Sequence, residues 1–170
     1  MKRTLCVLAL TFAVVAPGFV APVLADDAKT IGQGLNEKWL EAFNKQDAAA
    51  LTSLYTADAV LLPQGVDQPI IGTDNIRKFM EGMLKQKIDN MVTPVAEVNM
   101  IDPKHLYQAG TWSGDAGAQH INGTYLDIIV QDGDTWKYRA STWNMMPPPA
   151  AATASTATGT TTGSSPANKQ

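Results

Sequence analysis

Asp127 is the side chain in this sequence whose setting most suggests chemistry. It is the one carboxylate in the run Tyr-Leu-Asp-Ile-Ile-Val at 125–130, which otherwise has the composition of a buried β-strand. Because side chains alternate along a strand, Asp127 is predicted to share a face with Tyr125 and Ile129. Burial would raise its pKa unless a partner offset it, and the group could then act as a general acid or donate a hydrogen bond to a ligand carbonyl.

A purely structural role for Asp127 is the alternative. A buried carboxylate needs hydrogen-bond donors whatever its function. Tyr138, Asn144 or the indole N–H of Trp39 could supply them. In that case the carboxylate would only hold the strands in register.

The two histidines and the single cysteine add little chemistry. His105 and His120 are predicted on the face opposite Asp127, although a slip of one residue would bring His105 beside it. No cluster of His, Cys or Glu has the spacing of metal ligands, and Cys6 lies in the N-terminal segment. The sequence therefore predicts neither a metal nor a cofactor.

Two turns are predicted to position the strand that carries Asp127. Asp132-Gly133 stands between two β-rich runs and is typical of a two-residue hairpin turn, which would pair Asp127 with Tyr138. Another turn at 114–117 would bring the preceding strand alongside. The face predicted around Asp127 then comprises Leu106, Gln108, Trp112, Tyr125, Tyr138, Ala140, Thr142 and Asn144.

Hydrophobic periodicity predicts three helices before most of the strands. In the first helix an apolar residue recurs every four positions, at Ile31, Leu35, Trp39 and Phe43. Asp47 is predicted to cap the second helix. Helices followed by strands indicate an α+β fold with the helices on one face of a curved antiparallel sheet. The predicted helices span about 28–45, 47–55 and 73–87, and the predicted strands span 59–62, 91–101 with an interruption at Pro94, 105–114, and a final pair within 122–146.

The two ends of the 170-residue chain differ from its middle. Residues 1–25 have a basic start, an apolar run and small residues before Asp26, so they are predicted to be a signal peptide, with an uncleaved anchor as the alternative. Residues 28–146 are predicted to form one domain. Residues 147–170 are rich in Pro, Ala, Thr and Ser and are predicted to be disordered, with an extended stalk as the alternative.

The net charge of the chain indicates which classes of partner it can bind. Residues 1–25 hold two of the thirteen basic residues and none of the sixteen acidic ones, so their removal leaves a net charge of −5. An acidic domain without a Lys/Arg cluster is not expected to bind nucleic acid. The expected protein is exported, periplasmic or secreted, and free of the membrane once the signal peptide is cleaved.

Four segments in order resemble the nuclear transport factor 2-like superfamily, in its SnoaL-like and ketosteroid-isomerase-like branch. They read KWLEAFNKQD at 38–47, LYTADAVLLP at 54–63, IIGTDNIRKF at 70–79 and DGDTWKYRASTWN at 132–144. The last segment is similar to the end of small bacterial domains of unknown function in this superfamily. The resemblance implies a cystatin-like cone of three N-terminal helices on a curved sheet. It does not imply one activity, since this fold carries many functions.

Ketosteroid isomerases offer a comparison residue by residue. Their mechanism needs a tyrosine in the first helix, an aspartate base at the end of the first strand and a protonated aspartate deep in the sheet. The resemblance places Trp39 and Pro63 at the first two positions and leaves only Asp127 for the third. Isomerase chemistry by that mechanism is therefore not expected.

The resemblance and the predicted face together suggest a ligand pocket. The expected ligand is a small hydrophobic molecule, aromatic or with a carbonyl, held against Asp127. Two rivals remain open: a non-catalytic assembly module whose cone is filled by its own side chains, and an acid–base isomerase, cyclase or oxidoreductase-like enzyme. The superfamily also implies a homodimer through the outer sheet face, expected to comprise Leu126, Ile128, Val130 and Trp143. The predicted pocket comprises Trp39, Phe43, Tyr55, Phe79, Leu84, Gln108, Trp112, Tyr125, Tyr138, Thr142 and Asn144 around Asp127.

Overall fold

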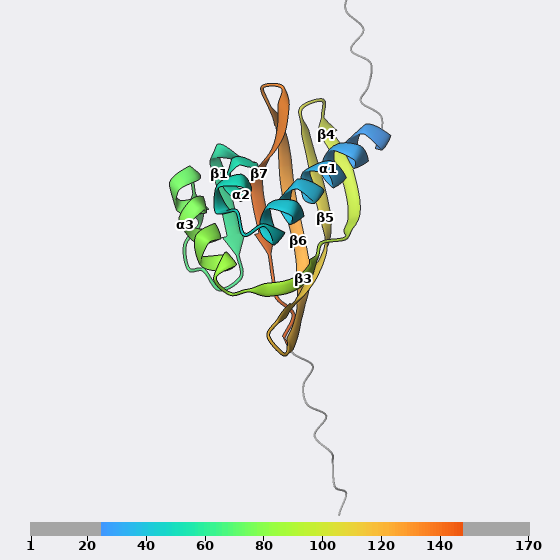
Figure 1. Ribbon diagram of the computed structural model, residues 1–170. Coiled ribbons are helices and arrows are strands. Elements are labelled where there is room, and N and C mark those ends of the chain that lie inside the picture. Colours follow the sequence, from blue (N-terminus) through green and yellow to red (C-terminus); the bar gives the residue numbers. More distant parts are fainter. Residues whose placement is uncertain (1–24, 148–170) are drawn as a thin grey trace, which may run out of the picture.

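The computed structural model describes residues 25–147, in which three helices lie against one face of a seven-stranded sheet (Figure 1). Apart from one bordering residue each, the predicted signal peptide and tail lie outside the described residues. Within this range no helix is both long and apolar enough to cross a membrane. The elements are α1 (Ala25–Asn44), α2 (Ala48–Ser53), β1 (Tyr55–Pro63), β2 (Ile70–Ile71), α3 (Thr73–Leu84), β3 (Ile88–Val92), β4 (Val95–Asp102), β5 (His105–Ala116), β6 (Gln119–Asp132) and β7 (Thr135–Trp143).

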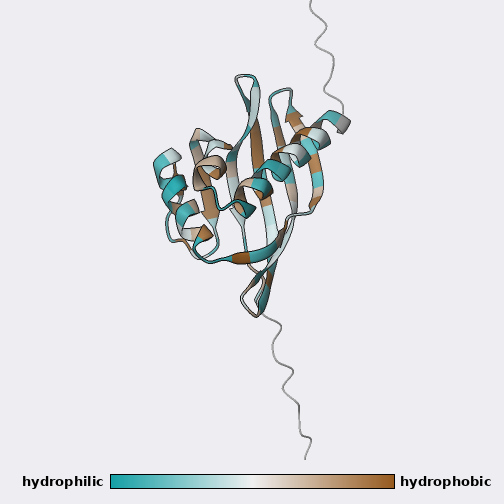
Figure 2. Ribbon diagram, in the orientation of Figure 1, coloured by the Kyte–Doolittle hydropathy of each residue, from teal (hydrophilic) through white to brown (hydrophobic). Residues whose placement is uncertain are grey.

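The helices bury the faces that their periodicity predicts. Leu35 and Phe43 of α1 are buried, as are Ile76 and Met80 of α3. Asp47 caps α2 by accepting a hydrogen bond from the backbone N–H of Ala50 at 2.9 Å. Figure 2 shows hydrophilic residues on the exposed sides of α1 and α3 and hydrophobic residues along the central strands. The core therefore lies between the helices and the sheet.

The strand order is β2-β1-β7-β6-β5, with β3 and β4 each pairing with part of β5. The expected α+β cone is confirmed. One pair of strands in its sheet is parallel: β1 runs alongside β7 in the same direction. The interruption predicted at Pro94 is confirmed: the predicted strand 91–101 is divided into β3 and β4, with the break at Thr93 and Pro94. Proline has no N–H to donate and thus interrupts the ladder here.

The β5–β6 pair is the longest and most regular hairpin in the sheet. Its register runs without interruption from His105 opposite Val130 to Ala116 opposite Gln119. The predicted turn at 114–117 is therefore misplaced. The turn consists of Gly117 and Ala118, and Gly117 has the positive φ of 63° that such a turn requires.

The β6–β7 hairpin departs from the predicted register. Its two-residue turn is Gly133-Asp134, which moves every pair by two residues and leaves the faces unchanged. A bulge opposite Ile128 and Ile129 then adds one residue to β7, and one extra residue exchanges the two faces of a strand. Asp127 consequently pairs with Ser141, and Tyr138 with Ile129.

Candidate functional site

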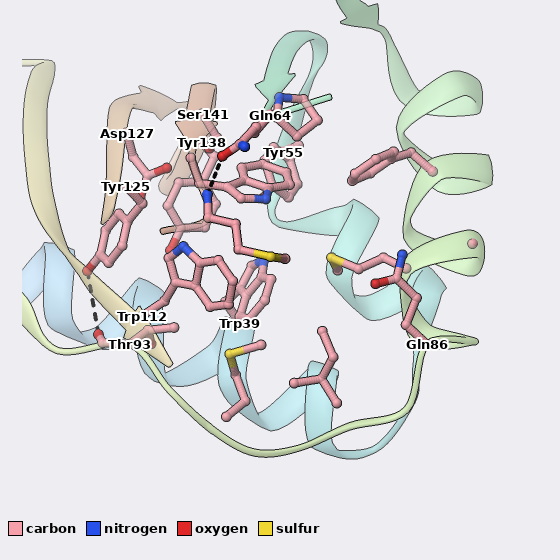
Figure 3. A pocket seen from close by; sticks show the side chains of 18 of the residues that line it. Trp39, Tyr55, Gln64, Gln86, Thr93, Trp112, Tyr125, Asp127, Tyr138 and Ser141 are labelled. Atoms are coloured by element: carbon pink, nitrogen blue, oxygen red, sulfur yellow. Dashed lines mark hydrogen bonds between the residues drawn. The ribbon is translucent and has the colours of Figure 1, made fainter. Parts of the chain in front are cut away.

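A cavity of about 630 Å³ lies between the helices and the inner face of the sheet (Figure 3). Its wall draws on α1, β1, α3, β3, β5, β6 and β7. Seven of the side chains that line it are aromatic, and methionines and Ile88 add further apolar surface. The aromatic residues of the wall are Trp39, Tyr55, Phe79, Trp112, Tyr125, Tyr138 and Trp143.

Two glycines let aromatic rings lie against the sheet. Gly110 pairs with Tyr125, and a Cβ on Gly110 would come within 2.6 Å of the Tyr125 hydroxyl. Gly123 pairs with Trp112, and a Cβ there would lie 2.6 Å from the indole Nε1. An aromatic side chain covering a cross-strand glycine is a recurrent way of packing a curved sheet. Here it places both rings at the wall of the cavity.

The other rings are held by neighbouring rings. Tyr55 of β1 and Tyr138 of β7 have centroids 5.1 Å apart, and Phe79 and Trp143 are 5.8 Å apart. Trp39 stacks on Phe43 of the next helical turn, with centroids 5.2 Å apart. Such pairs restrict the rings to defined orientations. The aromatic wall is therefore built before any ligand enters.

Asp127 lies at the polar end of the cavity and is 8 % exposed. Its Oδ2 accepts a hydrogen bond from Nε2 of Gln108 at 2.9 Å. Burial raises the pKa of Asp127 to about 6, although the neighbouring Ser141 hydroxyl and Gln108 amide partly oppose this shift. The carboxyl group can therefore change its protonation state between mildly acidic and neutral pH.

Three tyrosine hydroxyls belong to the same end of the site. Burial raises the pKa values of Tyr55, Tyr125 and Tyr138, and the charge of Asp127 raises each of them further. These phenols are thus neutral and can donate hydrogen bonds at ordinary pH. The Tyr125 hydroxyl lies 3.5 Å from the carbonyl oxygens of Thr93 and Pro94, at the corner between β3 and β4 (Figure 3).

Two buried polar atoms near Asp127 have unused hydrogen-bonding capacity. Within residues 25–147, neither Oε1 of Gln108 nor Oγ of Ser141 has a hydrogen bond of normal geometry. The Ser141 hydroxyl is close enough to influence the pKa values of Asp127 and Tyr55, and Ser141 is among the residues that line the cavity. The Ser141 Oγ atom is itself buried beside Asp127, so this hydroxyl acts on the carboxyl group and does not face the open cavity.

The predicted pocket residues fall into three groups. Besides Asp127, six of them line the cavity, while Phe43, Leu84 and Gln108 are buried in the core. Thr142 and Asn144 were misplaced on the inner face because of the β7 bulge. Thr142 instead donates to the carbonyl of Leu62, and Asn144 accepts from the backbone of Thr124. The six that line the cavity are Trp39, Tyr55, Phe79, Trp112, Tyr125 and Tyr138.

Several cavity residues were not predicted. Ser141 and Trp143 occupy the inner face in place of Thr142 and Asn144, so Trp143 does not belong to the outer face as expected. Ala140 likewise moves to the outer side. Met83 could have been predicted as a cavity residue, because it lies on the apolar stripe of α3. No local sequence pattern predicts that Met145 lines the cavity. The remaining unpredicted residues are Asn36, Pro63, Gln64, Gly65, Lys78, Gly82, Gln86, Ile88, Met91 and Thr93.

The histidines lie away from Asp127. His105 pairs with Val130 and contacts Asp102 at 2.8 Å, and His120 contacts Asp115 at the same distance. The one-residue slip that would bring His105 to Asp127 does not occur. Among residues 25–147, no three His, Cys, Asp or Glu side chains gather as a metal site would require.

Solved structures of low sequence identity share this fold. A ketosteroid isomerase-like protein from Erwinia carotovora atroseptica is 16 % identical, with a TM-score of 0.64, covering 74 % of this chain and all of that one. An NTF2-like protein of unknown function from Shewanella oneidensis is 16 % identical, with a TM-score of 0.62, covering 68 % and 98 %. A cystatin-like domain of unknown function from Nostoc punctiforme is 8 % identical, with a TM-score of 0.63, covering 72 % and 79 %.

Sequence comparison identifies the family. No protein with a curated description matches the chain. The model of the SnoaL-like domain matches residues 36–162, about three quarters of the sequence. The match runs from α1 past the last strand and includes every residue of the aromatic wall. This chain therefore belongs to the SnoaL-like domain family, and it shares its fold with solved NTF2-like proteins.

Proposed function

We propose that this domain binds one small, largely apolar, ring-containing molecule in its cavity, with Asp127 as the polar anchor. One observation carries the proposal: a buried carboxyl group opens onto an aromatic cavity of about 630 Å³. Pockets for small molecules have this size and this combination of apolar wall and few polar groups.

The size of the cavity weighs against the assembly-module alternative, which requires a cone filled by its own side chains. Self-association remains part of the proposal. Leu126 is 45 % exposed on the outer face, beside the half-buried Ile128 and Val130. An apolar sheet face of this kind suits a second copy of the chain.

We further propose export of the protein, on the basis of the signal-like residues 1–25.

Acid–base catalysis on a hydrophobic carbonyl compound is the second candidate. It is favoured by the pKa of Asp127, which is raised to about 6. A general acid or base is most efficient when its pKa lies near the pH at which the enzyme works. Three neutral tyrosine hydroxyls could stabilise a developing oxyanion. Trp39 and Pro63 line the cavity where an isomerase would have its tyrosine and its base, so any turnover would rest on Asp127 with these phenols.

Native mass spectrometry of the protein purified from its source tests the binding proposal. We expect a dimer that carries one small molecule per chain, released on denaturation. Asp127→Asn should reduce the bound fraction, whereas Asp67→Asn in the exposed loop before β2 should not. A chain that carries nothing, in protein from the source and after incubation with its small-molecule extract, would refute the binding proposal. A monomer would refute the dimer alone.

A further inference from the structure

Asp127 has no cationic partner in the described structure. The groups that face it are Gln108 from β5, Ser141 and Tyr138 from β7, Tyr125 from β6 and Tyr55 from β1. All of these are neutral polar groups. A buried carboxylate without a cation is costly, and the cost is relieved either by protonation or by a positively charged partner.

The charged residues of the packed helices do not fill this role. Lys78 of α3 is the one cationic residue among those that line the cavity within residues 25–147. Its side chain is exposed, and it is not among the groups that shift the pKa of Asp127. Glu37 and Lys38 of α1 are exposed as well. The positive charge that would complement Asp127 must therefore come from outside residues 25–147.

The wall around the carboxylate also suits a cation. Six electron-rich rings line the cavity, three of them indoles and three phenols. The face of such a ring attracts a cation, most strongly for tryptophan, and the attraction grows when water is excluded. Tyr125 and Trp112 are held against the sheet by Gly110 and Gly123 and so form a fixed part of this wall.

We propose that the molecule bound by this cavity is an organic cation: an amine on an apolar, ring-bearing body, with its ammonium group against Asp127. This inference rests on the proposed binding function and names the class of its ligand. The ammonium N–H groups donate to the carboxylate, while the rings surround the remainder. Such a charge-assisted hydrogen bond is stronger than one between neutral groups.

The direction of the pH dependence distinguishes an amine from a carbonyl compound. The amine needs ionised Asp127, so its affinity rises with pH through the pKa of about 6 and levels off above about pH 7. A carbonyl compound that accepts a hydrogen bond from the protonated acid shows the opposite trend. Between pH 5 and pH 7.5 the ionised fraction of such a group changes about tenfold, which sets the expected change in affinity.

Isothermal titration calorimetry with three probes tests the proposal. The probes are 2-(1-naphthyl)ethylamine, the matching alcohol 2-(1-naphthyl)ethanol and the ketone 1-(1-naphthyl)propan-2-one. At pH 7.5 we expect the amine to bind at least tenfold more tightly than either neutral probe, and to weaken about tenfold at pH 5. Asp127→Asn should abolish both the preference and the pH dependence, whereas the control Asp67→Asn should preserve both.

The possible outcomes separate this inference from the proposed function. If a neutral probe binds as tightly as the amine, or if Asp127→Asn keeps the amine preference, the amine assignment is overturned and the pocket stands. If no probe binds, the molecule released from the source protein decides: a basic nitrogen supports the assignment and its absence overturns it. If no probe binds and the source protein carries nothing, both proposals fail together.

Discussion

The two faces of β6 differ in burial and in composition. On the inner face, Asp127 and Ile129 are almost completely buried beneath the helices. On the outer face, Leu126 is nearly half exposed, and Ile128 and Val130 are half-buried. The inner face combines an acid and large rings with glycines opposite them, whereas the outer face presents aliphatic side chains.

The cavity depends on two positions of the inner face that have no side chain. Gly110 and Gly123 carry no side chain where Tyr125 and Trp112 need space, and the rings themselves form the wall. Polar atoms at this face are left partly unpaired, as at Ser141. An ordinary core would fill such space and satisfy such atoms, so these features distinguish the inner face from an ordinary core and support the binding function that we propose.

The largest expected effect on the free energy of unfolding comes from adding a methyl group to the inner face. In Gly123→Ala the new Cβ would collide with the carbonyl oxygen of Asn144 and lie 2.6 Å from the Trp112 indole. The backbone of β7 would have to move, so we expect a loss of about 3 kcal/mol in the free energy of unfolding, from the cost of overpacking. Urea denaturation followed by circular dichroism measures this loss.

Gly34→Ala is the matched control. Gly34 lies in α1, and a Cβ there would meet nothing within 4 Å. Alanine favours a helix over glycine by up to about 1 kcal/mol, so the control should be slightly more stable than the natural chain. Equal destabilisation by both substitutions would show that Gly123 is not a site of close contact.

The second largest effect concerns the charge of Asp127. Because burial raises its pKa from 3.8 to about 6 in the folded protein, the folded state binds more protons than the unfolded state between these values. The stability that protonation supplies is present below about pH 3.8 and is lost as the pH rises through 6. Asp127→Asn, which is always neutral, should therefore gain about 2–3 kcal/mol relative to the natural chain between pH 4 and pH 7.5.

Urea titrations at the two pH values measure this difference. The asparagine introduced by Asp127→Asn would retain an oxygen to accept the Gln108 hydrogen bond, so the fold should persist. The exposed Asp67→Asn should show no comparable change between the two pH values. A difference between Asp127→Asn and the natural chain that stays constant with pH would mean that folding does not raise the pKa of Asp127.

The inner face could be predicted from the sequence only where pairing is regular. Gln108 was correctly placed on the face that carries Asp127, because β5 and β6 pair without a break. Ser141 and Trp143 were missed, because the β7 bulge has no proline or glycine to mark it. One unmarked residue was enough to exchange Thr142 and Asn144 for the true neighbours of the carboxylate.

Other features depend on contacts between distant segments. The helical stripes and the Asp47 cap are local, and both were predicted correctly. The parallel pairing of β1 with β7 joins residues about 80 positions apart, and no local pattern specifies it. The cavity likewise arises from how α3 and α1 rest on the sheet, so its volume could not be derived from periodicity.

A third prediction addresses the outer face. Leu126→Lys would place a charge in the aliphatic surface through which we propose that two copies associate. The dissociation constant of the dimer should therefore rise at least tenfold. Sedimentation equilibrium measures the change. Val66→Lys, at an exposed apolar position in the loop after β1, is the control and should leave association unchanged. Equal effects of the two substitutions would exclude Leu126 from the interface, and ligand binding should survive both.

The smallest effects separate two neighbouring hydroxyls on opposite faces of β7. Thr142 Oγ1 donates to the Leu62 carbonyl at 2.8 Å, so Thr142→Val should cost about 0.5–1 kcal/mol of stability and leave ligand affinity unchanged. Ser141 Oγ is buried and makes no normal hydrogen bond within the described chain, so Ser141→Ala should change stability by less than about 0.5 kcal/mol. Because this hydroxyl lowers the pKa of Asp127 and so favours the ionised carboxylate, its loss should nevertheless weaken the binding of a cation several-fold. If Ser141→Ala instead destabilised the fold and spared binding, the inner hydroxyl would belong to the scaffold, and the functional contrast between the faces would rest on Asp127 alone.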